Sequence, residues 1–149
     1  MTDDSSPKRR TARVLTYAEA RIILDAGLAA ATAISVPSTV AVLDASREVV
    51  ALGRQDHAPT LTGEVAVAKA FTSIALRQPS ANLEAHVAPG GAFFGLHSAS
   101  ARGLVTFGGG LPLFDGDDVI GAIGASGGSI DEDLCVANAA FAAFEALSS

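Results

Sequence analysis

Three residues with chemically useful side chains lie together in the segment Gly-Arg-Gln-Asp-His-Ala-Pro-Thr: Arg54, Asp56 and His57. They follow a run of β-forming residues and precede a predicted helix. An imidazole beside a carboxylate can act as a general acid or base, and a nearby guanidinium can hold an anion. We therefore predict His57 and Asp56 as catalytic residues and Arg54 as a ligand-binding residue. In the competing interpretation, Asp56 caps a turn and His57 is simply exposed.

A second imidazole, that of His97, lies in a long glycine-rich segment over residues 88–103. Segments of this length without secondary structure are usually functional or mobile. Phe93 belongs to the same segment, so we predict Phe93 and His97 as ligand-binding residues, with His97 able to ligate a metal. An exposed loop histidine without a ligand is the alternative. His86, near the end of a short predicted helix, is expected to interact with the last helical carbonyls.

Lys69 interrupts an otherwise apolar helical segment, Val-Ala-Val-Ala-Lys-Ala-Phe-Thr-Ser-Ile-Ala-Leu. One interpretation is that its stem packs on the helix while its charge reaches solvent. The other is a cation that binds a carboxylate at the border of the sheet-facing surface, and on that basis we predict Lys69 as a ligand-binding residue.

Cys135 is the one cysteine of the chain, which excludes an intramolecular disulfide. It has no base beside it in sequence and is predicted to be a small core residue.

Eight of the fifteen glycines lie in the stretch from Thr106 to Gly128. A phosphate-binding loop of the P-loop type requires a lysine after its glycines, whereas residues 104–149 contain neither Lys nor Arg. Strands this poor in side chains allow a helix or another subunit to pack closely, and they also leave room for a flat ligand. We predict Gly109 and Gly110 as ligand-contacting positions.

The hydrophobic pattern predicts helices and strands in the order helix, hairpin, helices, three strands, helix. Thr16 and Glu19 form a capping box at the first helix, and Ser129 and Glu132 form another at the last. The predicted strands cover residues 38–44, 48–55, 104–107, 111–114 and 119–126, and the middle helices cover 62–77 and 81–87. Strands joined by tight turns pair antiparallel. The expected fold is therefore α+β, a five-stranded antiparallel sheet flanked by helices.

The length of 149 residues is that of one ordinary domain. We expect a mobile N-terminal tail over residues 1–13, which holds a cluster of basic residues, and a single domain over residues 14–149. Only 5% of the residues are aromatic and Trp is absent, so the core is built from small side chains. Such a core gains burial through association, and we expect a homo-oligomer.

The net charge of −6 argues against a nucleic-acid partner, because phosphate binding needs an electropositive surface. No apolar run follows the charged residues near the start, so a secretory signal is not expected. No stretch approaches the roughly 20 apolar residues of a membrane-spanning helix. We therefore expect a cytoplasmic protein without a membrane partner.

An ordered set of motifs resembles the GlcG/HbpS-like family, which also forms the C-terminal domain of PduO. The motifs are LTYAEARIILDAGLAAA, VPSTVAVLDASREVVALGR, AVAKAFTSIALRQPS, PGGAFFGL, LVTFGGGLPL and DGDDVIGAIGASGG. The resemblance implies a profilin-like α/β fold and ring-like homo-oligomers, often octamers. It also implies haem or corrinoid association in some members. This chain departs from the family in the segment Gln-Asp-His-Ala-Pro, where His57 stands at a position at which Gly is common.

Three functional hypotheses follow. In the first, the protein binds or degrades haem, with His57 or His97 as the iron ligand and Arg54 or Lys69 near the propionates. In the second, it is a cofactor-independent isomerase, lyase or cyclase for a small anionic metabolite, with His57 as acid or base and Asp56 as its orienting partner. In the third, it is a structural oligomer without a ligand.

Overall fold

The structure is a computed structural model that describes residues 10–147 and 149. Most of the predicted tail, residues 1–9, lies outside the described residues. Residues 10–13 are exposed and irregular, and Arg10 forms an ion pair with Asp118. Among the described residues, no helix combines the length and hydropathy needed to cross a bilayer.

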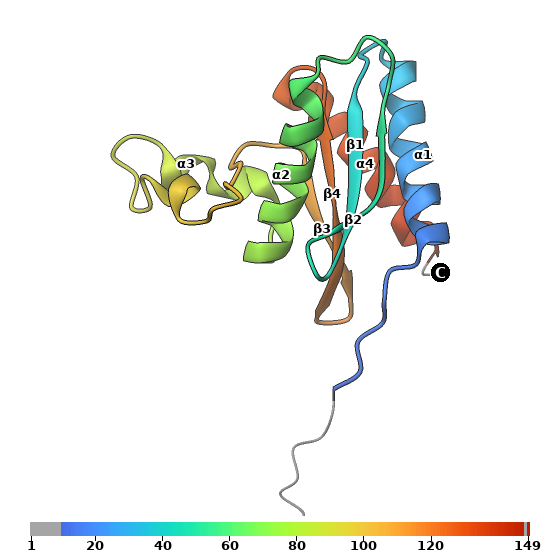
Figure 1. Cartoon of the computed structure of the whole chain (residues 1–149), viewed down its shortest axis with the longest axis horizontal. Helices are drawn as coiled ribbons and strands as arrows, with labels where there is room; N and C mark the ends of the chain where they lie inside the picture. Colours follow the sequence, from blue (N-terminus) through green and yellow to red (C-terminus); the bar gives the residue numbers. More distant parts are fainter. Residues whose placement is uncertain (1–9, 148) are drawn as a thin grey trace, which may run out of the picture.

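Within residues 10–147, one antiparallel sheet carries the fold, with its four strands in the order β2-β1-β4-β3. Two helices, α1 and α4, cover one face of the sheet, and α2 covers the other (Figure 1). The elements are α1 (Tyr17–Ala33), β1 (Thr39–Asp44), β2 (Val49–Arg54), α2 (Leu61–Leu76), the 3-10 helix η1 (Ser80–Leu83), α3 (Glu84–Val87), the 3-10 helix η2 (Leu96–Ser98), β3 (Gly110–Asp115), β4 (Asp118–Ser126) and α4 (Ile130–Leu147).

The prediction of five strands is wrong, because residues 104–107 form no strand in the described structure. The N–H of Val105 donates to the Thr72 hydroxyl at 3.0 Å, and the N–H of Leu104 donates to the His97 carbonyl at 3.2 Å. These donors are thus satisfied by helix α2 and by a loop. Both edges of β4 are already occupied by β1 and β3, so a further strand has no ladder to join there.

Both predicted capping boxes are confirmed. The Glu19 N–H donates to the Thr16 hydroxyl at 3.2 Å, and the Thr16 N–H donates to the Glu19 carboxylate at 2.9 Å. At the last helix, the Glu132 N–H donates to the Ser129 hydroxyl at 3.3 Å, and the Ser129 N–H donates to the Glu132 carboxylate at 2.7 Å. Each helix therefore starts where its own local sequence satisfies donors that the first turn leaves free.

Close packing explains Gly121 and Gly124 of β4, in agreement with the first of the two interpretations of these side-chain-poor strands. A Cβ on Gly124 would collide with the carbonyl of Ala66 in α2, and one on Gly121 would collide with the carbonyl of Leu43 in β1. Helix α2 can therefore lie directly against the sheet only because Gly124 has no side chain, and Gly121 allows the close approach of β1.

Strand β1 is buried on both faces. Val40 and Val42 belong to the core beneath α1 and α4, whereas Ala41 and Leu43 belong to the core beneath α2.

The prediction that Cys135 is a core residue is wrong, because this residue is exposed. Asp133, two residues earlier in α4, is buried, and a step of two positions turns a helix by about 200° toward the opposite side.

A lobe formed by residues 80–103 projects from the side of α2, and it carries η1, α3 and η2 (Figure 1). The short helix predicted over residues 81–87 is confirmed, since η1 and α3 together cover 80–87. The loop after it was predicted to be structureless, but successive turns organise it: the Gly91 N–H donates to the Ala88 carbonyl at 2.8 Å and the Leu96 N–H to the Phe93 carbonyl at 2.9 Å.

Candidate functional site

Arg54, Asp56 and His57 lie where β2 ends, and all three are exposed. Asp56 and His57 form a turn, in which His57 adopts a left-handed backbone conformation with φ of 71°. Arg54 donates from Nη1 to the Ala58 carbonyl at 3.3 Å. Within the described residues no hydrogen bond joins the Asp56 carboxylate to the His57 imidazole. The structure therefore places the predicted catalytic pair side by side in the chain, in a solvent-exposed turn.

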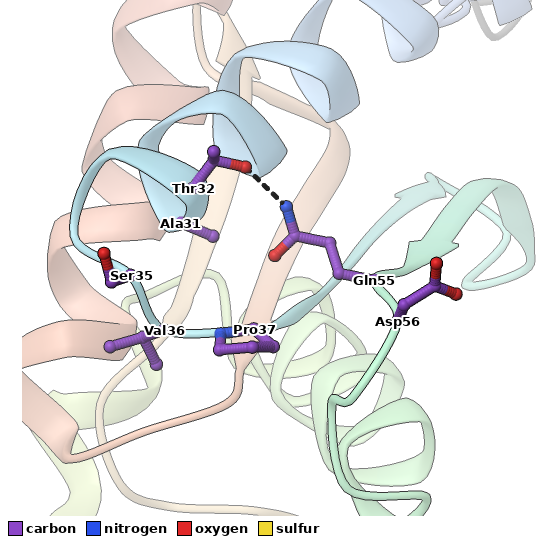
Figure 2. A pocket seen from close by; sticks show the side chains of 7 residues that line it. All are labelled: Ala31, Thr32, Ser35, Val36, Pro37, Gln55 and Asp56. Carbon is purple, nitrogen blue, oxygen red and sulfur yellow. Dashed lines mark hydrogen bonds between the residues drawn. The ribbon is translucent and has the colours of Figure 1, made fainter.

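A hollow of 430 Å³ lies beside this turn, between the end of α1 and the end of β2 (Figure 2). Gln55 fixes one wall, because its Nε2 donates to the Thr32 hydroxyl at 2.9 Å and its Oε1 accepts the Ser38 N–H at 3.0 Å. Figure 2 shows the Gln55 side chain turned toward Thr32 and Asp56 on the segment that follows. The lining residues are Ala31, Thr32, Ser35, Val36, Pro37, Gln55 and Asp56. This hollow was not expected from the sequence, since its two walls, residues 31–37 and 55–56, are at least 18 positions apart in the chain.

His97 and Phe93 are both exposed residues of the lobe. The Phe93 ring packs edge-on against the imidazole of His86, with 6.1 Å between ring centroids. His97 lies four residues after Phe93 in the chain, in η2, and its carbonyl accepts the Leu104 N–H. The two candidate metal ligands therefore sit on separate segments, His57 before α2 and His97 in the lobe. Among the described residues, no group of three or more His, Cys, Asp or Glu side chains is arranged to hold a metal ion.

Lys69 is fully buried, and its ammonium is held by protein groups. Its Nζ lies 2.6 Å from Oδ2 of Asp133 and donates to the Ala125 carbonyl at 2.9 Å. The ring of Phe107 covers the ammonium, with 5.0 Å between Nζ and the ring centroid. Burial lowers the pKa of Lys69, and the hydrogen bond and charge of Asp133 offset part of that effect.

Asp133 completes this arrangement by accepting the N–H groups of Gly127 and Gly128 on Oδ1, at 2.9 and 3.0 Å. One ion pair thus ties α2 to the end of β4 and to the first turn of α4. The sequence analysis missed Asp133 as the partner. A sequence signal for this pair was present. A carboxylate that is buried needs a cation, and residues 104–149 contain no Lys or Arg, so the partner of a buried Asp133 had to come from earlier in the chain.

Gly109 and Gly110 are buried beside the same lysine. Gly109 has a φ of 120°, and a Cβ there would come within 2.8 Å of the Lys69 Nζ. The N–H of Gly110 donates to the Ser80 hydroxyl at 2.9 Å. These contacts give both glycines a packing role in this structure, and their contact with a ligand stays a prediction, as does that of Lys69.

Comparison with known proteins identifies the family. Residues 15–142 match the model of a family described as haem degrading protein HbpS-like. An uncharacterised 15.0 kDa protein from the dhaT-dhaS intergenic region of Citrobacter freundii is 33% identical over 140 residues, which is 94% of this chain and 99% of that protein. The corrinoid adenosyltransferase PduO of Citrobacter freundii is 32% identical over 139 residues, or 93% of this chain. The chain spans only 42% of that enzyme's length.

Solved structures agree with this assignment. Protein ORFY of Klebsiella pneumoniae superposes with a TM-score of 0.90 at 30% identity, over 95% of this chain and 97% of that one. The PduOC:heme complex superposes with a TM-score of 0.84 at 33% identity, over 88% of this chain and 95% of that one. HbpS superposes with a TM-score of 0.79 at 26% identity, over 91% and 93% of the two chains. The chain therefore belongs to the HbpS-like family.

Proposed function

We propose that this protein binds haem or a related tetrapyrrole, and that the imidazole of His57 or His97 ligates the iron. The observation that carries the proposal is the likeness in fold and sequence to a relative crystallised as a haem complex, PduOC. Membership of a family described as haem degrading supports the same ligand class.

The side chains of this chain fit such a group. Both imidazoles are exposed, and neutral imidazole is a common axial ligand of haem iron. His97 shares its lobe with Phe93, which offers apolar surface to a porphyrin plane, and His57 has the exposed guanidinium of Arg54 three residues away for a propionate. Lys69 could bind a propionate only if its ion pair with Asp133 were broken, so Arg54 is a better propionate partner than Lys69. When bound, haem supplies a redox-active iron.

Titration of the purified protein with haemin tests the proposal. We expect a saturable change of the Soret band that is lost or displaced in either His57→Ala or His97→Ala. His86→Ala is the matched control, because His86 is also an exposed lobe imidazole but packs against Phe93. An absorbance change that grows without saturation, or one that is identical in all variants, contradicts the proposal.

Haem degradation is part of the same proposal and has its own readout. A catalytic role requires that the Soret band of bound haem decays in the presence of a reductant and oxygen, whereas a binding protein leaves it unchanged.

We further propose that the protein works in the cytoplasm and as a homo-oligomer of up to eight copies. Several large apolar side chains that are more than half exposed, among them Leu61 and Phe94, support self-association.

A second function is favoured by the backbone at His57. Its left-handed conformation adjoins the 430 Å³ hollow that Asp56 lines, and unusual backbone conformations are concentrated at active sites. In this alternative the protein is a cofactor-independent isomerase, lyase or cyclase for a small anionic metabolite, with His57 as acid or base. His57→Asn removes the titratable group and tolerates the left-handed conformation. Turnover of a panel of small carboxylates, followed by NMR, should vanish in this variant while the fold is kept, and turnover that persists removes His57 from the mechanism.

A further inference from the structure

The outer part of the lobe, residues 84–103, contains no buried residue. Leu83 is the last buried residue before it, and Gly108 is the first buried residue after it. A segment with few buried contacts has no core of its own, and such segments open at a lower free energy than the core elements of the same protein. The position of the outer lobe must therefore come from a few specific contacts with other elements.

The side chain of Arg102 supplies such contacts. Its Nη2 donates to the Arg47 carbonyl at 3.0 Å, and its Nη1 lies 3.2 Å from Oε1 of Glu48. The guanidinium also covers the ring of Phe71, with 4.4 Å between Cζ and the ring centroid. Phe71 belongs to α2 and is only 4% exposed. One side chain thus ties the lobe both to the β1–β2 hairpin and to α2.

The turns of the lobe carry this constraint to His97. Among the described residues, no other side chain of residues 84–103 forms a hydrogen bond or an ion pair with an element outside the lobe. The backbone N–H of Arg102 donates to the Ser100 hydroxyl at 3.3 Å, and the Leu104 N–H donates back to the His97 carbonyl at 3.2 Å. Residues 97–104 therefore form a closed loop that begins at His97 and contains Arg102.

We propose that Arg102 is a positioning residue, which clasps the lobe to the β1–β2 hairpin and thereby sets the place of the His97 imidazole. When Arg102 is released, residues 84–103 open as a unit while the sheet and its helices stay folded. The role of His97 in this inference rests on the proposed haem binding, whereas the opening of the lobe does not. A ligand that is held in place before binding loses less conformational freedom when it binds.

The three contacts of Arg102 need the shape of a guanidinium. A planar guanidinium can donate to two acceptors at its edge while its face lies on an aromatic ring, whereas an ammonium is a compact charge on a flexible stem. Lysine at this position would keep the charge opposite Glu48 and lose the stacking on Phe71. We therefore expect Arg102→Lys to hold the lobe only in part.

Hydrogen exchange followed by NMR tests the clasp on the protein without haem. In Arg102→Gln we expect the amides of residues 98–104 to exchange about tenfold faster than in the wild type, with Arg102→Lys in between. The Ala125 amide donates to the Gly109 carbonyl at 2.9 Å within the sheet, and its rate should not change. Unchanged rates in the lobe overturn the proposal. An equal acceleration at Ala125 also overturns it, because Arg102 would then stabilise the whole fold.

Arg47→Gln is the matched control. The Arg47 guanidinium also lies over the Phe71 ring, with 5.3 Å between Cζ and the centroid, but it belongs to the hairpin. The substitution keeps the backbone carbonyl that accepts from Arg102. We expect wild-type exchange rates in the lobe, and an acceleration equal to that of Arg102→Gln contradicts the clasp.

The ion pair of the clasp is open to solvent, with the side chains of Arg102 and Glu48 43% and 72% exposed. Salt screens exposed pairs of this kind. A rise from about 0.05 to about 0.5 M sodium chloride should therefore accelerate exchange in the wild-type lobe, and have no effect on the lobe in Arg102→Gln or Glu48→Gln. A salt response that persists in Arg102→Gln overturns the role of this pair.

Titration with haemin separates the clasp from the proposed function. We expect Arg102→Gln to bind haemin about tenfold more weakly and with a displaced Soret band, and Arg47→Gln to match the wild type. If the lobe of Arg102→Gln exchanges faster but its haemin affinity and spectrum are unchanged, the positioning of His97 is overturned. A wild type without a saturable Soret change overturns the proposed haem binding, and the exchange rates still decide the clasp.

Discussion

At the scale of single residues, the most consequential contact is the buried pair of Lys69 and Asp133, with 2.6 Å between Nζ and Oδ2. The helical pattern left open whether the charge of Lys69 reaches solvent, and the structure buries the side chain completely. The pattern did not predict the partner, which is 64 residues away. A buried charge is tolerated only when it is paired and hydrogen-bonded, and Ala125 and Asp133 meet both conditions.

Removing one member of the pair should therefore be costly. We expect Lys69→Met to lower the free energy of unfolding by about 3 kcal/mol, because Asp133 is left with an uncompensated buried charge. Urea denaturation measures the change. In the Lys69→Met/Asp133→Asn double variant, the amide oxygen of residue 133 still accepts the N–H groups of Gly127 and Gly128. The double variant should therefore lose less free energy of unfolding than the two single variants together, by about 2 kcal/mol. Additive losses would show that the two side chains are not coupled.

At the scale of elements, the position of α2 depends on the bare backbone of β4. We expect Gly124→Ala to destabilise the fold by about 1–3 kcal/mol, since the added methyl group meets the Ala66 carbonyl and α2 must move. Gly63→Ala is the matched control, because nothing lies within 4 Å of a Cβ there and alanine is the better helix former. Thermal unfolding should show a lower melting temperature for Gly124→Ala only. Equal effects of both substitutions would contradict the packing argument.

The start of α1 gives a pH-dependent prediction. The hydrogen bond from the Thr16 backbone lowers the pKa of Glu19 below its ordinary value of 4.5, against an opposing effect of burial. The native state then binds this proton less readily than the unfolded chain does. The resulting stabilisation is complete above about pH 4.5 and is lost as the pH falls through the lower, folded pKa.

Glu19→Gln removes the titration while it keeps the shape of the side chain. At about pH 7 the wild type should be more stable than this variant by about 0.5–1 kcal/mol, and the difference should shrink steadily as the pH is lowered below about 4.5. Urea denaturation over a series of pH values from neutral downward measures the difference. A gap between wild type and variant that is independent of pH would rule out the charged form of Glu19 as its cause.

At the scale of the whole molecule, the lobe projects from the packed layers of sheet and helices (Figure 1). Its side chains Phe93 and Phe94 leave apolar surface in water, as does Leu61 at the start of α2. Association that buries them stabilises the native state by mass action. We therefore expect the melting temperature of the wild type to rise with protein concentration, and that of Phe94→Asp to stay constant. Differential scanning fluorimetry over a hundredfold dilution series checks this, and a constant wild-type value would contradict association.

The sequence by itself determined the features that depend on neighbouring residues. The capping boxes, the β1–β2 hairpin, the tight turn after β3 and the exposed turn at His57 all follow from local chemistry, and the motif order indicated the family that the comparisons confirm. The tertiary structure alone decided what depends on residues far apart in the chain. It assigned Asp133 to Lys69, gave the donors of residues 104 and 105 to a helix and a loop instead of a fifth strand, and turned Cys135 to solvent. The physical reason is that a side chain's burial and hydrogen-bond partners are set by which elements pack against it, and local sequence does not encode that packing.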